Sequence, residues 1–238
     1  MGETSVTAAS PDRSPLPGDA PPPTDGRLTR AARTRAAVVD ALLSLNEEGN
    51  LRPTARDIAA KAGVSLRSLY VHFDDLEALF VAASERHAQR MAALLPPLVT
   101  EGPFDQRLEA FLTRRTTIHE QGAGVRRAAV LQEPFSPALQ QALGAGRRLM
   151  RSEVRAAFAP EIDHPRVGTG QRLQLALESC TSAATWDALR LHQHLDIDTA
   201  TGQMRDMVQA FVTSWGPAPA DAADDAAGTR PASAPAGG

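Results

Sequence analysis

Apolar residues recur every three to four positions along most of the chain, and no segment keeps the strict alternation of a half-buried strand. The expected fold class is therefore all-α. Caps, glycines and prolines place the expected helices at about residues 30–48, 54–62, 65–70, 76–94, 105–121, 125–133, 136–158, 166–194 and 199–215.

The two ends of the chain differ from this helical pattern. Residues 1–26 are rich in proline, and residues 217–238 are dominated by Ala, Pro, Gly and Asp. Neither segment has enough large apolar side chains to offset the entropy of ordering, so both are expected to be disordered. They are either linkers and interaction segments or terminal extensions without a role. About 190 residues remain between them, enough for a sizeable core.

Local signals between Pro53 and Ser65 predict two short helices joined by a tight turn. Thr54 is a good N-cap, and Asp57 three residues later forms a short-armed capping box. Gly63 can take the left-handed conformation that ends a helix, and Ser65 can cap the next one. This is the pattern of a helix-turn-helix unit, whose second helix enters the major groove of DNA.

Three segments carry a resemblance to a known family: residues 57–65 (DIAAKAGVS), 69–73 (LYVHF) and 76–80 (LEALF). Their ordered combination resembles the TetR family of bacterial transcriptional regulators over residues 30–83. Beyond that range the resemblance is architectural. It implies a helix-turn-helix domain at 27–73, then a helical ligand-binding and dimerisation domain at 74–216 that begins with a linking helix at 74–95. One position departs from the family: Leu76 stands where a lysine commonly approaches a phosphate.

The second helix of the motif supplies most of the candidate DNA contacts. If Leu69 faces the core with Val64, its neighbours face outward, and Arg67 can either read a guanine or hold a phosphate. Tyr70 resembles a phosphate contact of the family and is otherwise a core residue, while His72 either touches phosphate or covers the core edge. The candidates are Arg30, Thr54, Lys61, Ser65, Leu66, Arg67, Ser68, Tyr70 and His72.

Charge distribution supports DNA as the partner. The chain has a net charge of −3, yet residues 27–73 contain eight basic and four acidic side chains. A local basic surplus on an acidic body is the footprint of a small DNA-binding domain.

The helices after the motif are expected to hold an effector and to form a dimer. The effector site is predicted among Phe111, Arg115, His119, Phe135, Met150, Glu178 and Trp186, each of which is otherwise ordinary core or surface. A four-helix interface across a two-fold axis is predicted from Leu173, Leu177, Cys180, Ala184, Leu191, Met204, Met207, Val208 and Phe211, unless these side chains pack on their own subunit.

Other classes of protein find little support. There is no glycine-rich phosphate loop, nucleophile elbow or zinc signature, so we expect no enzyme, no cofactor and no metal. His192 and His194 are two apart on a helix and cannot chelate together. No secretory signal or membrane-spanning run is evident, and the single Cys180 fits a cytoplasmic location. The sequence thus predicts a homodimeric one-component regulator, most simply a repressor, that binds a double-stranded operator and an unknown small molecule. The alternatives are a helical interaction protein with a degenerate motif, or an uncharacterised enzyme.

Overall fold

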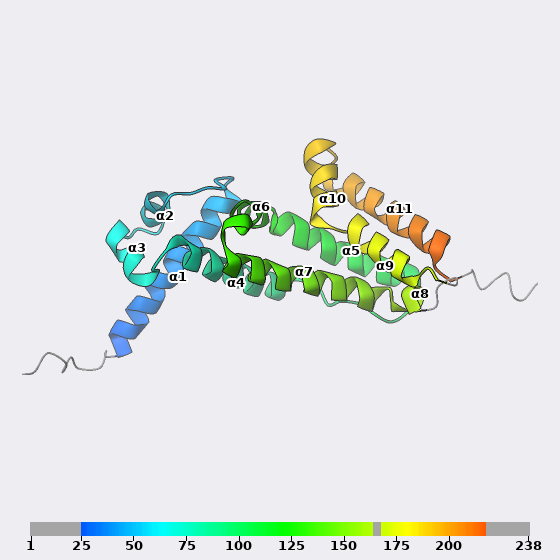
Figure 1. Ribbon diagram of the computed structural model, residues 1–238, viewed down its shortest axis with the longest axis horizontal. Helices are drawn as coiled ribbons and strands as arrows, with labels where there is room; N and C mark the ends of the chain where they lie inside the picture. The colour runs from blue at the N-terminus through cyan, green and yellow to red at the C-terminus, as the bar shows by residue number, and fades with distance from the viewer. Residues whose placement is uncertain (1–24, 164–167, 218–238) are drawn as a thin grey trace, which may run out of the picture.

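The computed structural model describes residues 25–163 and 168–217, and these residues contain helices and no strand (Figure 1). The expected all-α fold class is confirmed. The molecule is elongated, with α2 and α3 at one end and the C-terminal end of α11 at the other (Figure 1). The predicted disorder of residues 1–24 and 218–238 lies outside the described residues.

The N-terminal domain is built from α1 (Asp25–Glu47), α2 (Ala55–Lys61) and α3 (Leu66–His72). α1 begins earlier than predicted, so Thr29 lies inside it instead of capping it. These helices enclose a small apolar core. Its fully buried side chains are Val38, Leu42, Leu43, Ile58, Leu69 and, from α4, Leu79.

The remaining helices form the second domain. α4 (Leu76–Leu94) connects the two domains, and α5 (Phe104–Gln121) and α7 (Pro137–Ala157) run the length of the body. Shorter elements lie between and beyond them: α6 (Ala123–Gln132), the 3₁₀ turn η1 (Glu133–Phe135) and α8 (Ala159–Asp163). The C-terminal part consists of α9 (Gly170–Cys180), α10 (Ala183–Asp187), the π-helical turn η2 (Ala188–His192) and α11 (Ile197–Trp215).

The prediction of one long helix over residues 166–194 is wrong. In the part of this range that the structure describes, α9, α10 and η2 are separate elements. α9 ends at Cys180, and Ser182 starts α10 by accepting a hydrogen bond from the Thr185 amide. The chain then forms the π-helical turn η2, in which the Gln193 amide donates a hydrogen bond to the Ala188 carbonyl five residues earlier. Serine at 182 competes for backbone groups and favours a cap over a helix interior, a signal that apolar spacing does not carry.

Two other helix starts illustrate how far local signals reach. Ser136 caps α7 as predicted, with its hydroxyl accepting from the Leu139 amide at 3.0 Å. Asp105, in contrast, lies in the first turn of α5 and does not cap it, because the helix already begins at Phe104 after Pro103. An acidic side chain in the first turn still favours the helix through its dipole.

The domain junction depends on a close approach between α6 and the end of α1. A Cβ atom at Gly124 would lie 2.4 Å from the carbonyl oxygen of Asn46, a backbone atom that cannot move away alone. Beside it, Asp40 of α1 accepts hydrogen bonds from Arg86 and Arg90 of α4. Ser136, ahead of α7, donates to Glu77 at 2.5 Å. The N-terminal domain is therefore fixed to α4 and α6, and α4 is fixed in turn to the start of α7.

Gly124→Ala is expected to destabilise the protein by about 1–3 kcal/mol, because the new methyl group forces α6 away from α1. Gly146→Ala in α7 is the matched control, since a Cβ there meets nothing within 4 Å. That control should gain about 0.5–1 kcal/mol through the lower backbone entropy of alanine. Thermal unfolding of the two variants measures the contrast, and equal behaviour would rule out the close contact.

Candidate functional site

The helix-turn-helix is held by capping interactions at both of its helices. The Asp57 amide donates to the Thr54 hydroxyl at 3.2 Å, and the Thr54 amide donates back to the Asp57 carboxylate at 2.9 Å. The hydrogen bonds that the Thr54 amide and the Thr54 hydroxyl donate to the Asp57 carboxylate hold the pKa of Asp57 below its ordinary value. Gly63 takes a φ of +68°, and the Ser65 hydroxyl accepts from the Ser68 amide at 3.0 Å. The predicted capping box, glycine turn and second cap are confirmed.

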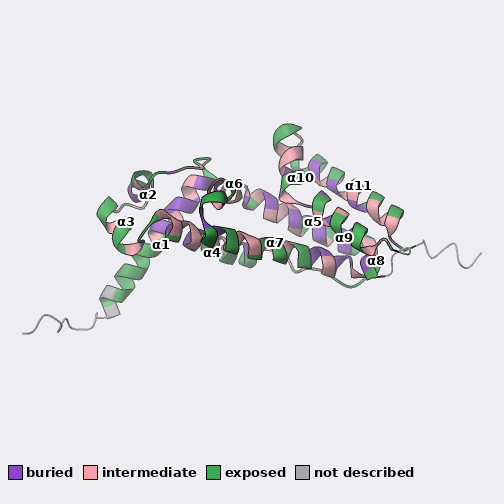
Figure 2. Ribbon diagram, viewed as in Figure 1, coloured by how far each residue is buried: buried purple, intermediate pink, exposed green. Residues whose placement is uncertain are grey.

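α3 presents a solvent-facing surface at the end of the molecule (Figure 2). Leu69 is fully buried and Phe73 is nearly so, and they fix the helix to α1 and α2. Tyr70 is 47% exposed, which rules out a place in the core. Among the other candidates on this helix, Ser65, Leu66 and Arg67 are exposed, and Ser68 and His72 are partly buried.

Val71 is a further member of this surface that the sequence reasoning missed. It is 72% exposed, an unusual position for a valine on a short helix. Residues two apart on a helix point in nearly opposite directions, so the buried Leu69 already implied an outward Val71. An apolar side chain there can contact the methyl group of thymine in a major groove.

Basic side chains surround α3, but not all of them are free. The Lys61 ammonium lies 2.5 Å from the Glu48 carboxylate, and this hydrogen bond lowers the pKa of Glu48. Arg30 is exposed on the first turns of α1, and Arg52 and Arg56 are exposed on either side of Thr54 in the chain. Arg67 is thus one of several exposed cations at this end of the molecule.

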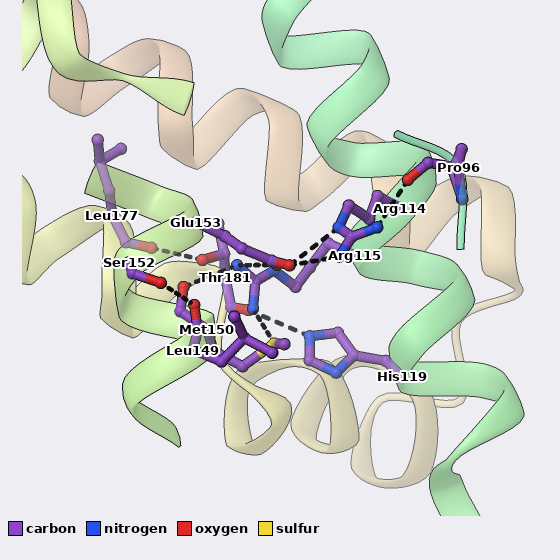
Figure 3. Close-up of polar contacts among 10 residues, drawn as sticks. All are labelled: Pro96, Arg114, Arg115, His119, Leu149, Met150, Ser152, Glu153, Leu177 and Thr181. Atoms are coloured by element: carbon purple, nitrogen blue, oxygen red, sulfur yellow. Dashed lines mark hydrogen bonds and ion pairs between the residues drawn. The ribbon is translucent and has the colours of Figure 1, made fainter. Parts of the chain in front are cut away.

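A second constellation of polar groups lies inside the C-terminal domain, and we call it the Arg115 cluster (Figure 3). The Arg115 guanidinium contacts the Met150 sulfur at 2.7 Å and the Met150 carbonyl oxygen at 3.2 Å, and it stands 4.7 Å above the Phe111 ring. Glu153 lies 3.8 Å away and forms its main pair with Arg114, at 2.5 Å. Burial lowers the pKa of Arg115 to about 10.

His119 extends the cluster one turn along α5. Its Nε2 lies 3.1 Å from the Thr181 carbonyl oxygen, and its ring stacks on Trp186 at 5.8 Å. Burial lowers the pKa of His119 to about 4, so the imidazole is neutral at pH 7 and Nε2–H donates to the carbonyl. Trp186 in turn donates its indole N–H to Glu120 at 2.8 Å. The break between α9 and α10 supplies the Thr181 carbonyl that His119 uses.

Five of the seven predicted effector residues take part in these contacts, in two groups one turn apart on α5: Phe111, Arg115 and Met150 in the first, and His119 and Trp186 in the second. Two lie elsewhere. Phe135 is 80% exposed on η1, because the 3₁₀ turn at Glu133–Phe135 carries it to the surface. Glu178 accepts a hydrogen bond from Gln174 on the partly exposed side of α9. No local pattern in the sequence indicates that Glu153 is the partner of Arg114 and Arg115.

Two cavities of the described residues lie apart from the Arg115 cluster. A cavity of about 20 Å³, the size of a single water, sits at the domain junction between Leu42, Phe80, Val125 and Leu139. A groove of about 280 Å³ lies between α1 and α4. Neither is lined by any of the predicted effector residues, and Phe111, Arg115 and Trp186 are buried, at 1%, 2% and 1% exposed.

The predicted dimer residues divide into two groups. Leu173, Leu177, Met204 and Val208 are fully buried inside the subunit, and Cys180 is 5% exposed. Their prediction as interface residues is corrected, because α9 and α11 pack their main apolar stripes on each other, α9 also on α7 and α8, and α11 also on α5. Ala184 and Leu191 are exposed, and Met207 and Phe211 are partly buried. Leu175, 56% exposed on α9, was missed because it lies off the main stripe.

Metal sites and membrane-spanning helices are both absent from the part of the chain that the structure describes. No group of three or more His, Cys, Asp or Glu side chains within residues 25–163 and 168–217 is placed to hold a metal ion, and His164 lies outside these ranges. In the same ranges no helix has both the length and the apolar character needed to cross a membrane.

The geometry defines the class of protein. It is an all-α protein with a capped helix-turn-helix at one end and a larger helical domain behind it. The family model described as "Bacterial regulatory proteins, tetR family" matches residues 39–83. The chain therefore carries the N-terminal domain of the TetR family and has the fold of TetR-family transcriptional regulators.

Solved structures agree with this fold. A transcriptional regulator from Rhodococcus sp. Rha1 is 16% identical, with a TM-score of 0.61, over 79% of this chain and 99% of that one. A putative TetR-family regulator from Mesorhizobium loti MAFF303099 is 17% identical, with a TM-score of 0.59, over 79% and 98%. The multidrug binding protein EbrR, complexed with imidazole, is 19% identical, with a TM-score of 0.53, over 86% and 99%. A search of curated proteins found no significant match.

Proposed function

We propose that this protein is a one-component transcriptional repressor that binds a palindromic operator as a homodimer and is released by a small molecule. The observation that carries this proposal is the exposed face of α3. Its helix is capped at the start and anchored by Leu69 and Phe73, while Leu66, Arg67 and Tyr70 remain exposed. A rigid helix with a polar and basic outer face fits the major groove.

Dimerisation follows from the geometry of DNA. Two recognition helices must meet half-sites about one helical turn apart, which requires a two-fold pair of subunits. The outer sides of α9 and α11 supply a surface for that pair. Leu175 on α9 and Met207 and Phe211 on α11 are not fully used by the subunit's own core, and Leu191 on the adjoining turn η2 is exposed as well.

The position of Leu76 weakens one family contact without removing the surface. Asp75 caps α4 by accepting from the Ala78 amide at 2.8 Å, and Leu76 packs partly buried against the N-terminal core. The lysine common at this position is replaced by a packing residue. Arg30, Arg52 and Arg56 are exposed and available to hold phosphates. A helical interaction protein with a degenerate motif is the competing function.

Release by a ligand requires that the ligand bind one conformation better than the other. The Arg115 cluster lies in the domain that would bind it, and α4 and α6 connect that domain to α1. The fold is shared with the multidrug binding protein EbrR, which holds imidazole. We therefore place the effector of this protein among α5, α7 and α10.

Gel-shift binding to the promoter next to the protein's own gene tests the proposal. We expect a sequence-specific complex that weakens steeply as salt rises, because phosphate contacts release counterions. Reporter transcription should increase when the gene is deleted. Absence of any specific complex at every protein concentration would support the interaction-protein alternative.

Arg67→Ala is expected to weaken operator binding by about 1–3 kcal/mol and to relax specificity at one base pair. Titration of the wild type and the variant on operators changed at single positions measures this. Arg151→Ala on α7 is the matched control, because Arg151 is equally exposed but lies on a helix of the C-terminal domain. A uniform loss over all sequences, with a salt slope lower by about one, would instead make Arg67 a phosphate contact.

A further inference from the structure

Arg115 is a buried cation whose contacts in this conformation are poor. Its side chain is 3% exposed, and within the described residues its Nε finds no hydrogen-bond partner. Its other partners are a thioether sulfur and a carbonyl oxygen, both on Met150. A thioether is a weak acceptor, whereas a guanidinium has five N–H donors and matches a carboxylate in a planar fork.

The charge around Arg115 is also incompletely balanced. Among the described residues, Glu153 is the carboxylate in contact with both Arg114 and Arg115, and it accepts its short hydrogen bonds, at 2.5 and 3.0 Å, from Arg114. The neighbouring pairs Arg126–Asp187 and Arg190–Glu120 are each balanced. His119 is neutral at pH 7, because burial lowers its pKa to about 4. Two guanidiniums and one carboxylate therefore leave one positive charge inside an apolar domain.

Two apolar side chains contact this charge, and a third lies one turn further along. Phe111, 1% exposed, lies under the guanidinium, and Met150, partly exposed on α7, touches it through its sulfur. Trp186, also 1% exposed, stacks on His119, the residue one turn along α5. Methionine is unbranched and adapts its shape easily. Its side chain occupies the contact that a carboxylate oxygen would take on Arg115, and it connects that contact to the surface. Movement of this one side chain would open Arg115 without breaking the pair between Arg114 and Glu153 (Figure 3).

We propose that the Arg115 cluster binds a small amphipathic carboxylate. Its carboxylate pairs with the Arg115 guanidinium in place of Met150, and its apolar body packs between Phe111, Met150 and Trp186. The bound anion cancels the surplus charge, and the protein gains charge-assisted hydrogen bonds that it lacks when empty. This inference rests on the proposed function for its regulatory meaning, and it names the chemical class of the effector.

A matched panel of probes tests the proposal on the full-length protein. The probes are phenylbutyl, octyl and naphthylmethyl compounds, each as a carboxylate, an alcohol and a primary amine. Binding is followed by the thermal midpoint, and by tryptophan fluorescence in a Trp215→Phe variant, in which Trp186 beside His119 is the tryptophan that remains. We expect carboxylates to raise the midpoint and alcohols and amines to leave it unchanged. A panel in which no carboxylate binds, or in which alcohols or amines bind as well, overturns the proposal.

Three variants assign the binding to Arg115. Arg115→Met removes the charge at similar volume and should weaken carboxylate binding by about 10- to 100-fold. Arg115→Lys keeps the charge but loses the fork, so an intermediate loss is expected. Glu153→Gln increases the positive surplus and should strengthen binding. Undiminished binding in Arg115→Met would make the arginine a structural ion-pair partner only, even if the other variants fail to fold.

Gel shifts on the same samples separate this inference from the proposed function. Operator binding that carboxylates do not affect, together with release by a neutral compound, contradicts the inference and leaves the repressor intact. Carboxylate binding that depends on Arg115, in a protein that binds no operator, supports the site and contradicts the repressor. α5, which carries Arg115, lies in the C-terminal domain apart from α3 at the end of the molecule (Figure 1), so neither result can be caused by loss of a DNA contact.

Discussion

Replacing Arg107 by methionine is expected to lower the free energy of unfolding by about 3–5 kcal/mol. Arg107 is 2% exposed and Glu161 is 6% exposed, and the two groups meet through paired hydrogen bonds at 2.5 and 3.0 Å. Arg107 also donates to the Gly102 carbonyl at 3.1 Å and to the Ala157 carbonyl. Without its partner the Glu161 carboxylate is a buried, uncompensated charge. Urea unfolding followed by circular dichroism measures the loss.

Two further variants separate the charge from the packing. In Arg107→Met with Glu161→Leu, both charges are absent, and most of the lost stability should return because apolar side chains replace a buried pair well. Arg205→Met breaks an exposed ion pair between Arg205 and Glu109. The Arg205 side chain is 35% exposed and the Glu109 side chain is 57% exposed. That control should cost less than about 1 kcal/mol. A cost for Arg107→Met as small as this control would mean that the pair is not buried in solution.

The features that the sequence predicted well are those set by neighbouring residues. Thr54, Ser65 and Ser136 cap the helices that follow them, because an N-cap needs only a hydroxyl and amides within three residues. The linking helix Leu76–Leu94 also has the expected bounds, since an aspartate precedes it and two prolines follow it. The exposed surface of α3 depends on these local signals, so the sequence predicts most of its residues.

The features that the sequence could not predict depend on distant residues. An apolar stripe on α9 or α11 shows which face avoids water, but not whether the partner is the same subunit or another. The stripes therefore predict Leu173 and Met204 as interface residues, whereas both side chains pack in the core of the subunit. The pair Arg107–Glu161 joins residues 54 positions apart, and nothing in the local pattern links them. Arg115 and His119 were named by residue type, while Glu153 and Thr181, which they meet, were not.

The stability of the protein is expected to fall by about 3 kcal/mol more between pH 6.5 and pH 4 than that of a His119→Gln variant. Burial lowers the pKa of His119 from 6.5 to about 4. In this window the unfolded chain binds a proton at residue 119 and the folded chain does not. Lowering the pH therefore favours unfolding. The contribution is complete above pH 6.5 and is lost as the pH approaches 4.

Glutamine is the right replacement because its amide can still donate to the Thr181 carbonyl without titrating. His87, whose pKa is also lowered by burial, and the capping aspartates titrate in the wild type and in the variant, so their effects cancel in the difference. His192→Gln is the control, because it makes the same substitution at an exposed position. Thermal unfolding at half-unit steps of pH records the three profiles. Parallel curves for the wild type and His119→Gln would show that His119 is hydrated, and with it the interior that Arg115 shares.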